Sequence, residues 1–448
     1  MCKVGEWMEL THRKYLAVTL PFVISSIAVP VIGAVDTAVV GRLGSPDYIS
    51  AVALGAVIFS TIYWLLGFLR ITTAGMTAQA VGRQDNQEVF YILLRALVMA
   101  TAIGIFLLIC RKAIFNTALL ILQPEVNIAE LVRQYFEILV WGFVPFLLYQ
   151  VLAGWITGIL HIKIIVAVEL GISLLNFILD IVLVNVWHLS VQGVAYASLL
   201  AQVAGFILAV LFFFWQRQYL TSVNLHSLFA KNACLKLTRC CTHLLIRTLC
   251  MLMMVNIFMS ESAAMGGSIL AANSILFQIQ YIMGDVFAGM SQTAALYAGI
   301  AVGSGNSKLF KDNLKLSGFW SLFVGFVMSL GYYLLRESVL YFFTDLSDVL
   351  STAYEVDIYI MLFPVISALG IVYYGIFNGA LVTAPICYSM LLTGASFLAT
   401  KIALVPVFGN TGLWQAFLIF YIARTSFLLI FIPYLCRKTL YNIKSSNG

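Results

Sequence analysis

The sequence predicts an all-α integral membrane protein with about twelve transmembrane helices, arranged as two pseudo-symmetric lobes of six helices. Of its 448 residues, 62% are hydrophobic and only 10% are charged, whereas a typical soluble domain carries about 25% charged residues. Apolar runs such as 166–187 and 191–215 reach the roughly 20 residues that cross a bilayer. Lipid is therefore the expected solvent for most of the chain.

The apolar runs are predicted to be helices. Backbone groups must be hydrogen-bonded inside hydrocarbon, so a span is either a helix or a strand of a closed barrel. Barrel strands need about 10 residues with alternating polarity, and that alternation is absent here. We expect spans near 15–41, 48–74, 89–110, 135–160, 164–187, 190–215, 244–264, 268–299, 315–335, 358–383, 388–407 and 412–435.

The longest polar connection, 216–243, divides the chain into parts of similar length. We predict an N-terminal six-helix lobe at 1–215, a cytoplasmic inter-lobe linker at 216–243, a C-terminal six-helix lobe at 244–436 and a cytoplasmic tail at 437–448. The first apolar run is long enough to span and lacks a small-residue cleavage site, so we expect it to stay in the membrane rather than be removed as a signal peptide.

An internal repeat supports this division. Five identical residues recur between 72–82 and 293–303, and each is displaced by the same difference in residue number, which is 293 − 72. Residues 180–184 align with 401–405 at the same difference. We call this difference the repeat offset. Six spans is an even number, so both halves enter from the same side and form a parallel repeat. Such repeats are typical of transporters that work by alternating access.

The basic residues predict the orientation. Of the 25 Lys and Arg residues, five fall in outer segments if the N-terminus is cytoplasmic (Arg42, Arg111, Lys112, Arg133 and Arg336), four fall within spans (Arg70, Arg95, Lys401 and Arg424), and the other 16 fall in inner segments. This bias predicts that both termini lie on the cytoplasmic side of the cell (inner) membrane. The net charge of +6 then indicates contact with anionic lipid and not with nucleic acid.

No metal site or cofactor is expected. Cys234, Cys240 and Cys241 lie close together, but no fourth ligand stands at a zinc-like spacing, and His243 is too near Cys241 for the usual pattern. No Gly-rich phosphate-binding loop of the Walker type appears either. The spans also lack a His/Asp cluster that would indicate an enzyme.

Two acids lie deep within expected spans. Counted from the span ends near Leu16 and Ile164, Asp36 and Asp180 lie about 20 and 16 residues in, so their depths differ by about 6 Å. A charge at such a depth costs roughly 2.5–3.5 kcal/mol, which makes each acid a functional candidate. Asn176 precedes Asp180 by four residues and shares its helix face.

Desolvation and a second nearby carboxylate both favour the protonated form of an acid, so protonation near neutral pH is plausible for Asp36 or Asp180. All five histidines fall in loops or at span edges, and carboxylates would therefore carry any protons. The alternative is that each acid only fixes packing, through a hydrogen bond across helices or a contact with an arginine.

Other ionisable residues have simpler interpretations. Glu137, Glu169, Arg70 and Arg95 lie within about two turns of their span ends, where snorkelling or pairing at the rim explains them. In the second lobe, Lys401 stands at the repeat position of Asp180, and Arg424 lies near mid-span. We interpret both chiefly as members of internal ion pairs with a structural or gating role, with Asp285 and Glu261 as counter-ions.

Three segments carry a resemblance to a known family: 30–44 (PVIGAVDTAVVGRLG), 69–82 (LRITTAGMTAQAVG) and 176–180 (NFILD). The chain resembles the multidrug and toxic compound extrusion (MATE) transporters, in particular their DinF-like branch, over nearly its whole length. The resemblance implies twelve helices in two lobes, export of hydrophobic or cationic organic compounds, and coupling to inward flow of H+ or Na+.

The resemblance also implies roles for particular residues. It maps the coupling site onto Asp36 and Asp180 with Asn176 beside them, and it places cavity positions at Tyr135 and Ser198. Family members use a bent first helix, which Pro21 matches, since a proline inside a helix removes a hydrogen bond and permits a bend; a static kink explains Pro21 equally well. Some branches of the family rely on an acid of the second lobe, for which Asp285 is the candidate here. Gln292 stands nearby, where an acid is expected in close relatives, and this departure argues against a second-lobe cation site.

The sequence thus predicts a secondary antiporter that exchanges H+, favoured over Na+, for a small organic substrate. Membrane lipid is the other expected partner, and the protein is expected to be a monomer. The main alternative is a flippase for lipid-linked precursors, which predicts a basic central cavity. A channel is less favoured, because two unlike lobes give no symmetric charged ring.

Overall fold

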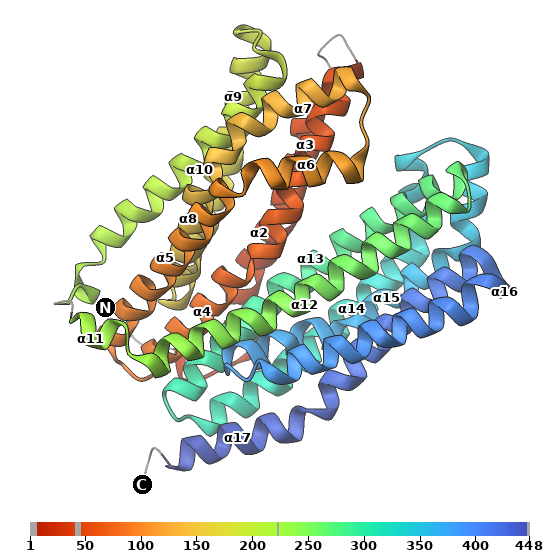
Figure 1. The fold of residues 1–448 in the computed structure, drawn as a ribbon. Coiled ribbons are helices and arrows are strands. Elements are labelled where there is room, and N and C mark those ends of the chain that lie inside the picture. The colour runs from red at the N-terminus through yellow and green to blue at the C-terminus, as the bar shows by residue number, and fades with distance from the viewer. Residues whose placement is uncertain (1–6, 41–45, 222–223, 446–448) are drawn as a thin grey trace. The chain divides into compact units, whose positions relative to one another are not determined.

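The computed structural model describes residues 7–40, 46–221 and 224–445, and these residues are helical with short connections (Figure 1). For residues 28–40, 46, 185, 225 and 440–445, the structure describes the backbone and not the side chains. The chain divides into two compact units: the first unit is Ile24–Cys241, and the second unit combines Met1–Val23 with Thr242–Gly448. The division passes through two helices, α2 (His12–Val40) and α12 (Lys231–Ala264).

The beginning of the chain packs with its second half. Asn306 donates a hydrogen bond to the Met8 carbonyl over 3.3 Å, and the rings of Trp7 and Tyr297 lie 5.5 Å apart. The expected lobe 1–215 groups these first residues with the first half of the chain instead. Hydropathy identifies a span, but it does not report which helices that span packs against.

The unit Ile24–Cys241 contains the shorter helices. After the end of α2 these are α3 (Pro46–Leu66), α4 (Phe68–Gly82), α5 (Asn86–Ile109), α6 (Arg111–Leu122), α7 (Val126–Leu139), the 3-10 turn η1 (Val140–Gly142), α8 (Phe143–Gly158), α9 (Ile162–Asp180), the π-helix η2 (Ile181–Val186), α10 (Ser190–Trp215), the 3-10 turn η3 (Arg217–Tyr219) and α11 (Leu225–Leu228).

The other unit is built from long helices that run side by side in Figure 1. They are α12, then α13 (Gly267–Gly303), α14 (Ser307–Phe343), α15 (Ser347–Gly379) and α16 (Ala384–Ile430). The shorter helix α17 (Ile432–Ser445) follows α16. Within α16, Gly409 has φ +56° and marks a kink between two helices. Glycine adopts this conformation without the steric cost that a Cβ would bring.

Among the residues whose side chains the structure describes, ten helical segments are long and apolar enough to cross a membrane. The helix α2, with 29 residues, comes in addition to them. The last segment, Ala384–Thr439, has 56 residues and holds two crossings on either side of Gly409, since one crossing needs about 20 residues. These counts agree with the twelve expected helices.

Several helix ends differ from the expected spans by more than two turns. The expected spans 244–264, 315–335 and 358–383 correspond to helices that begin at Lys231, Ser307 and Ser347. The extra turns are polar, so a hydropathy window ends before the helix does. About half of the expected linker 216–243 is consequently part of α12.

Each unit contains a close contact between two helices, built on a pair of glycines four residues apart. A Cβ on Gly379 of α15 would lie 1.9 Å from the Ala295 carbonyl oxygen of α13, and one on Gly375 would lie 2.0 Å from the Ser291 oxygen. Small residues allow helix backbones to approach this closely.

The first unit repeats this arrangement between α8 and α4. A Cβ on Gly154 would lie 2.4 Å from the Arg70 carbonyl oxygen, and one on Gly158 would lie 2.9 Å from the Ala74 oxygen. All four positions are related to those of the second unit by the repeat offset, for example 154 to 375. We call this pair of helix contacts the repeated glycine contact.

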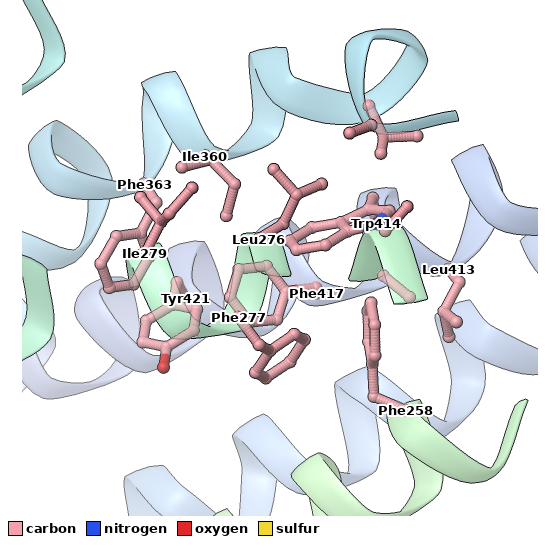
Figure 2. Packing of buried hydrophobic residues seen from close by; sticks show 14 of the residues in the cluster. Phe258, Leu276, Phe277, Ile279, Ile360, Phe363, Leu413, Trp414, Phe417 and Tyr421 are labelled. Carbon is pink, nitrogen blue, oxygen red and sulfur yellow. The ribbon is translucent and has the colours of Figure 1, made fainter. Parts of the chain in front are cut away.

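An aromatic core holds the second unit together (Figure 2). It joins α12, α13, α15 and α16 through rings that are almost completely buried. Phe258 and Phe277 lie 4.6 Å apart between ring centroids, and Trp414 lies 5.0 Å from Phe258. Figure 2 shows Tyr421 at one end of this cluster, with its hydroxyl directed away from the other rings.

Candidate functional site

Among the residues of the first unit whose side chains the structure describes, the most buried acid is Asp180, the last residue of α9. Its side chain is 1% exposed, and its Oδ2 accepts a hydrogen bond from Asn176 Nδ2 over 3.3 Å. The four-residue spacing places both side chains on one face of the helix, as the sequence predicts, and this allows the contact. The amide partly replaces the water that a carboxylate loses on burial.

The π-helix η2 begins directly after Asp180 and runs from Ile181 to Val186. Turns of π-helix are rare and occur frequently at functional sites, because they change the direction of neighbouring side chains. Nothing in the composition of this apolar stretch distinguishes it from an ordinary α-helix. The sequence interpretation therefore missed it.

The expected partner of Asp180 lies outside the residues described with side chains. The backbone of α2 is helical as far as Val40, so Asp36 lies within a helix, but its side chain is not described. The pairing of Asp36 with Asp180 stays a prediction.

A second polar cluster lies on the same face of α9 as Asp180. Glu169 forms an ion pair with Arg70 of α4 and accepts a hydrogen bond from the Ser25 hydroxyl of α2. The side chains of Glu169 and Arg70 are 11% and 23% exposed. Glu169 precedes Asp180 by about three helical turns, which is about 16 Å along the axis.

The other rim residues are also paired. Arg95 contacts Glu88 over 2.8 Å and donates to the Leu228 carbonyl of α11 over 2.7 Å. Arg133 contacts Glu137 over 2.9 Å on the surface of α7. These contacts agree with the pairing that the sequence suggested for such positions.

The three residues assigned to a substrate cavity lie in different surroundings. Tyr135 is 4% exposed, and its ring packs against Gly55 and against Phe59, whose ring centroid is 6.1 Å away. Ser198 is half-buried on α10, and Pro21 is half-buried on α2. Pro21 precedes by two residues the point at which the units divide, after Val23.

The second unit brings together only part of its predicted ion pairs. Lys401 of α16 forms an ion pair with Glu261 of α12. Asp285 of α13 is half-buried and forms no ion pair with any residue that the structure describes. Asp357, which the sequence interpretation did not select because it borders an expected span, is 4% exposed and lies 3.6 Å from Arg336.

Arg424 is 6% exposed on α16, and it makes no ion pair with a residue of the described part of the chain. Its Nη1 lies 3.8 Å from the sulfur of Met251, which stands one helical turn after Arg247 on α12. The predicted pairing of Arg424 with an acid is thus not seen among the described residues. Arg247 was counted with the inner-segment cations and was not singled out by the sequence interpretation.

Over the residues that the structure describes, there is no group of three or more His, Cys, Asp or Glu residues that could hold a metal ion. The polar side chains instead form small buried sets on separate faces of a helical bundle. Buried acids within membrane-length helices, on a chain folded as two repeated halves, define the class of secondary membrane transporters.

Comparison with known proteins identifies the family within this class. The MatE family profile matches residues 21–182 and 244–403, one match in each half. The DNA damage-inducible protein F of Escherichia coli (strain K12) is 30% identical over 413 residues, covering 90% of this chain and 88% of that protein. The Multidrug and toxin extrusion protein 1 of Xenopus tropicalis is 24% identical over 447 residues, covering 95% of this chain and 74% of that protein. The chain belongs to the MATE family of transporters and is not an enzyme.

Solved structures confirm the fold. A structure described as "Crystal structure of MATE in the bent conformation" matches with a TM-score of 0.87 at 18% identity, over 100% of both chains. An outward-facing structure of a multidrug resistance MATE family transporter also gives a TM-score of 0.87 at 18% identity, over 99% of both chains. The predicted twelve-helix membrane fold is confirmed. Members of this family are multi-pass membrane proteins that couple the movement of an ion to the export of small organic substrates.

Proposed function

We propose that this transporter exports hydrophobic or cationic organic compounds in exchange for protons, and that Asp180, Asn176 and Asp36 form its coupling site. The observation that carries the proposal is the almost complete burial of Asp180 beside an amide donor. H+ is preferred over Na+, because burial of a carboxylate favours its protonated form.

The physical mechanism needs two states with different affinities. A buried carboxylate is stabilised when it is protonated, whereas a polar environment favours its ionised form. A proton that binds one state more tightly than the other shifts the equilibrium between them, and the substrate must shift it in the opposite direction. The π-helix after Asp180 is an element whose local geometry can change with the protonation of that carboxylate.

The energy of the membrane potential is sufficient for such an exchange. One charge that crosses 100 mV releases about 2.3 kcal/mol. At about 1.4 kcal/mol per tenfold ratio, this supports a roughly fifty-fold gradient of an uncharged substrate for each proton. We further propose that both termini face the cytoplasm, on the basis of the basic residues, and that the protein acts as a monomer in the cell (inner) membrane.

The test is transport of a fluorescent organic cation by the full chain in proteoliposomes, with either a pH gradient or a Na+ gradient imposed. Asp180→Asn is expected to abolish transport driven by the pH gradient, because the amide cannot exchange a proton. Asn176→Ala is expected to weaken it. Glu137→Gln is the matched control, since this carboxylate is 63% exposed beside Arg133, and its loss should leave transport unchanged.

The outcomes separate the alternatives. A response to the Na+ gradient alone would replace the proton in the proposal. Transport by Asp180→Asn equal to that of the unchanged chain would remove the coupling role. Transport of no organic cation under either gradient would favour the flippase of lipid-linked precursors.

A further inference from the structure

Two arginines of the second unit, Arg247 and Arg424, lie close together, because Arg424 contacts Met251, which stands one helical turn after Arg247 on α12. Neither arginine forms an ion pair with an acid in the described part of the chain. Arg424 is 6% exposed. Its Nη1 lies 3.8 Å from the thioether sulfur of Met251, which is a weak hydrogen-bond acceptor. The Nε of Arg247 is buried and has no hydrogen-bond partner among the described residues.

Aromatic side chains complete this group of residues. The Arg247 guanidinium lies over the ring of Tyr374 of α15, 4.5 Å from its centroid, and that of Arg424 lies 5.8 Å from the centroid of Tyr421. The Tyr374 hydroxyl is buried without a hydrogen-bond partner among the described residues, and its residue is 8% exposed. We call Arg247, Arg424, Tyr374 and Tyr421 the arginine pocket.

The arginine pocket lies away from one end of the unit. Arg247 lies on α12, which ends at Ala264, and Arg424 lies on the part of α16 that follows the kink at Gly409 and begins at Asn410. At a rise of about 1.5 Å per residue, Arg247 is about 25 Å from Ala264 and Arg424 is about 21 Å from Asn410. Both charges are therefore far from the end of the unit at which Ala264 and Asn410 lie.

Cation–aromatic contacts alone do not compensate such a pair. A contact of this kind is weak beside the penalty for burying an ion without a counter-ion. Two other cations of this unit are paired: Lys401 with Glu261, and Arg336 with Asp357. The two arginines thus differ from their neighbours in lacking a carboxylate among the described residues.

We propose that the arginine pocket binds the oxyanion group, a carboxylate or a phosphate, of an amphipathic molecule. Guanidinium groups bind such oxyanions through paired hydrogen bonds of matching geometry, and the Tyr374 hydroxyl adds a neutral donor. The half-buried and flexible side chain of Met251 provides an apolar contact for the rest of the molecule. The oxyanion comes either from a membrane lipid or from a free amphiphile.

Thermal unfolding of the full chain in a neutral detergent tests the proposal, with dodecyl phosphate as the probe and dodecyltrimethylammonium as a probe with the same tail and the opposite charge. Dodecyl phosphate is expected to raise the unfolding midpoint in a saturable manner, and the cationic probe is not. Arg247→Gln should weaken the apparent affinity for dodecyl phosphate at least tenfold, since a hydrogen bond to a charged group contributes about 1.5–3 kcal/mol. Lys401→Gln, which also removes a cation of this unit, should leave the affinity unchanged.

A second variant distinguishes binding from a structural role. If Arg424 is uncompensated when the pocket is empty, Arg424→Met should raise the midpoint without a probe and abolish the response to dodecyl phosphate. A structural Arg424 would give a lower midpoint instead. No saturable response of the unchanged chain, equal responses of Arg247→Gln and Lys401→Gln, or a lower midpoint for Arg424→Met would each overturn the proposal.

Nanodiscs distinguish the two sources of the oxyanion. A lipid source predicts that phosphatidylglycerol raises the midpoint over that in phosphatidylcholine, with the difference lost in Arg247→Gln. A free amphiphile predicts no effect of the lipid and an equal effect of dodecyl phosphate in both. Binding is measured without a gradient, so the result is independent of the proposed coupling to protons.

Discussion

Replacing Gly379 with alanine tests whether the repeated glycine contact sets the distance between α13 and α15. The added Cβ would lie 1.9 Å from the carbonyl oxygen of Ala295. This oxygen belongs to the backbone of a helix, so it cannot turn away as a side chain would. Contacts of a Cβ below 3.0 Å are essentially never seen, and the two helices must therefore separate locally by about 1.1 Å (3.0 − 1.9).

The expected cost follows from this displacement. Overpacking a well-packed interface typically costs about 1–3 kcal/mol, and the interface of α13 with α15 also includes the contact of Gly375 with Ser291. Because both contacts lie on the same pair of helices, one alanine loosens both. We expect Gly379→Ala to fall at the upper end of this range. In the first unit, Gly154→Ala needs only about 0.6 Å (3.0 − 2.4) and should cost less.

The assay is the thermal unfolding midpoint of the full chain in detergent, followed by the loss of the monodisperse peak in size-exclusion chromatography. Gly331→Ala on α14 is the matched control, because its Cβ would meet nothing within 4 Å. There, alanine should stabilise the helix by about 0.5–1 kcal/mol. A midpoint of Gly379→Ala equal to or above that of Gly331→Ala would refute the reasoning, as would a larger loss for Gly154→Ala.

Three further predictions concern buried polar groups. Glu169→Gln leaves Arg70 without its counter-ion, which should lower the free energy of unfolding by about 3–5 kcal/mol. We expect a lower unfolding midpoint, and we expect the additional substitution Arg70→Met to restore it. An unchanged midpoint for Glu169→Gln would contradict this prediction. Asn273 forms hydrogen bonds with Ser262, Asn410 and Trp414 over 2.7, 2.8 and 2.8 Å. Asn273→Ala should therefore lower the free energy of unfolding by at least about 1–3 kcal/mol, measured in the same assay. A loss of stability no larger than that caused by substituting an exposed residue would argue against this network. Burial lowers the pKa of His161, which lies between two spans, below its usual 6.5. The folded state then binds fewer protons than the unfolded state, so stability should fall as the pH drops below about 6.5; His161→Gln should reduce that slope, and equal slopes would exclude the effect.

The fold could be predicted from the sequence because its signals are strong and local. Apolar runs of membrane length and the repeat offset identify helices and repeated halves without any knowledge of contacts. The helix ends were less predictable, since the polar first turns of α12 and α14 extend beyond any apolar window. The grouping of Met1–Val23 with the second half was not predictable, because it depends on packing between distant parts of the chain.

The candidate site was predictable only where a short spacing determines a contact. The hydrogen bond between Asn176 and Asp180 follows from their four-residue separation. The ion pair of Lys401 with Glu261 joins two helices far apart in the sequence, and charge alone suggested it without fixing it. Arg247 carried no distinguishing signal, since its position near the start of an expected span resembles that of an ordinary inner cation.

The repeat offset also shows which features the two units share and which they do not. The repeated glycine contact recurs at all four positions, so the backbone packing of α8 on α4 resembles that of α15 on α13. At the same offset, Glu169 corresponds to Met390 and Asp180 corresponds to Lys401.

The buried polar residues have therefore diverged on a common backbone. A close contact of backbones tolerates no added atom, so it constrains both halves alike, whereas a buried charge can be exchanged once a local partner exists, as Glu261 exists for Lys401. The first unit accordingly carries the buried carboxylate of the proposed coupling site, and the second unit carries two arginines that lack an acid among the described residues. The substitutions described above change the charges of one unit and leave those of the other unit unchanged. The coupling site of the first unit and the arginine pocket of the second unit can therefore be tested separately.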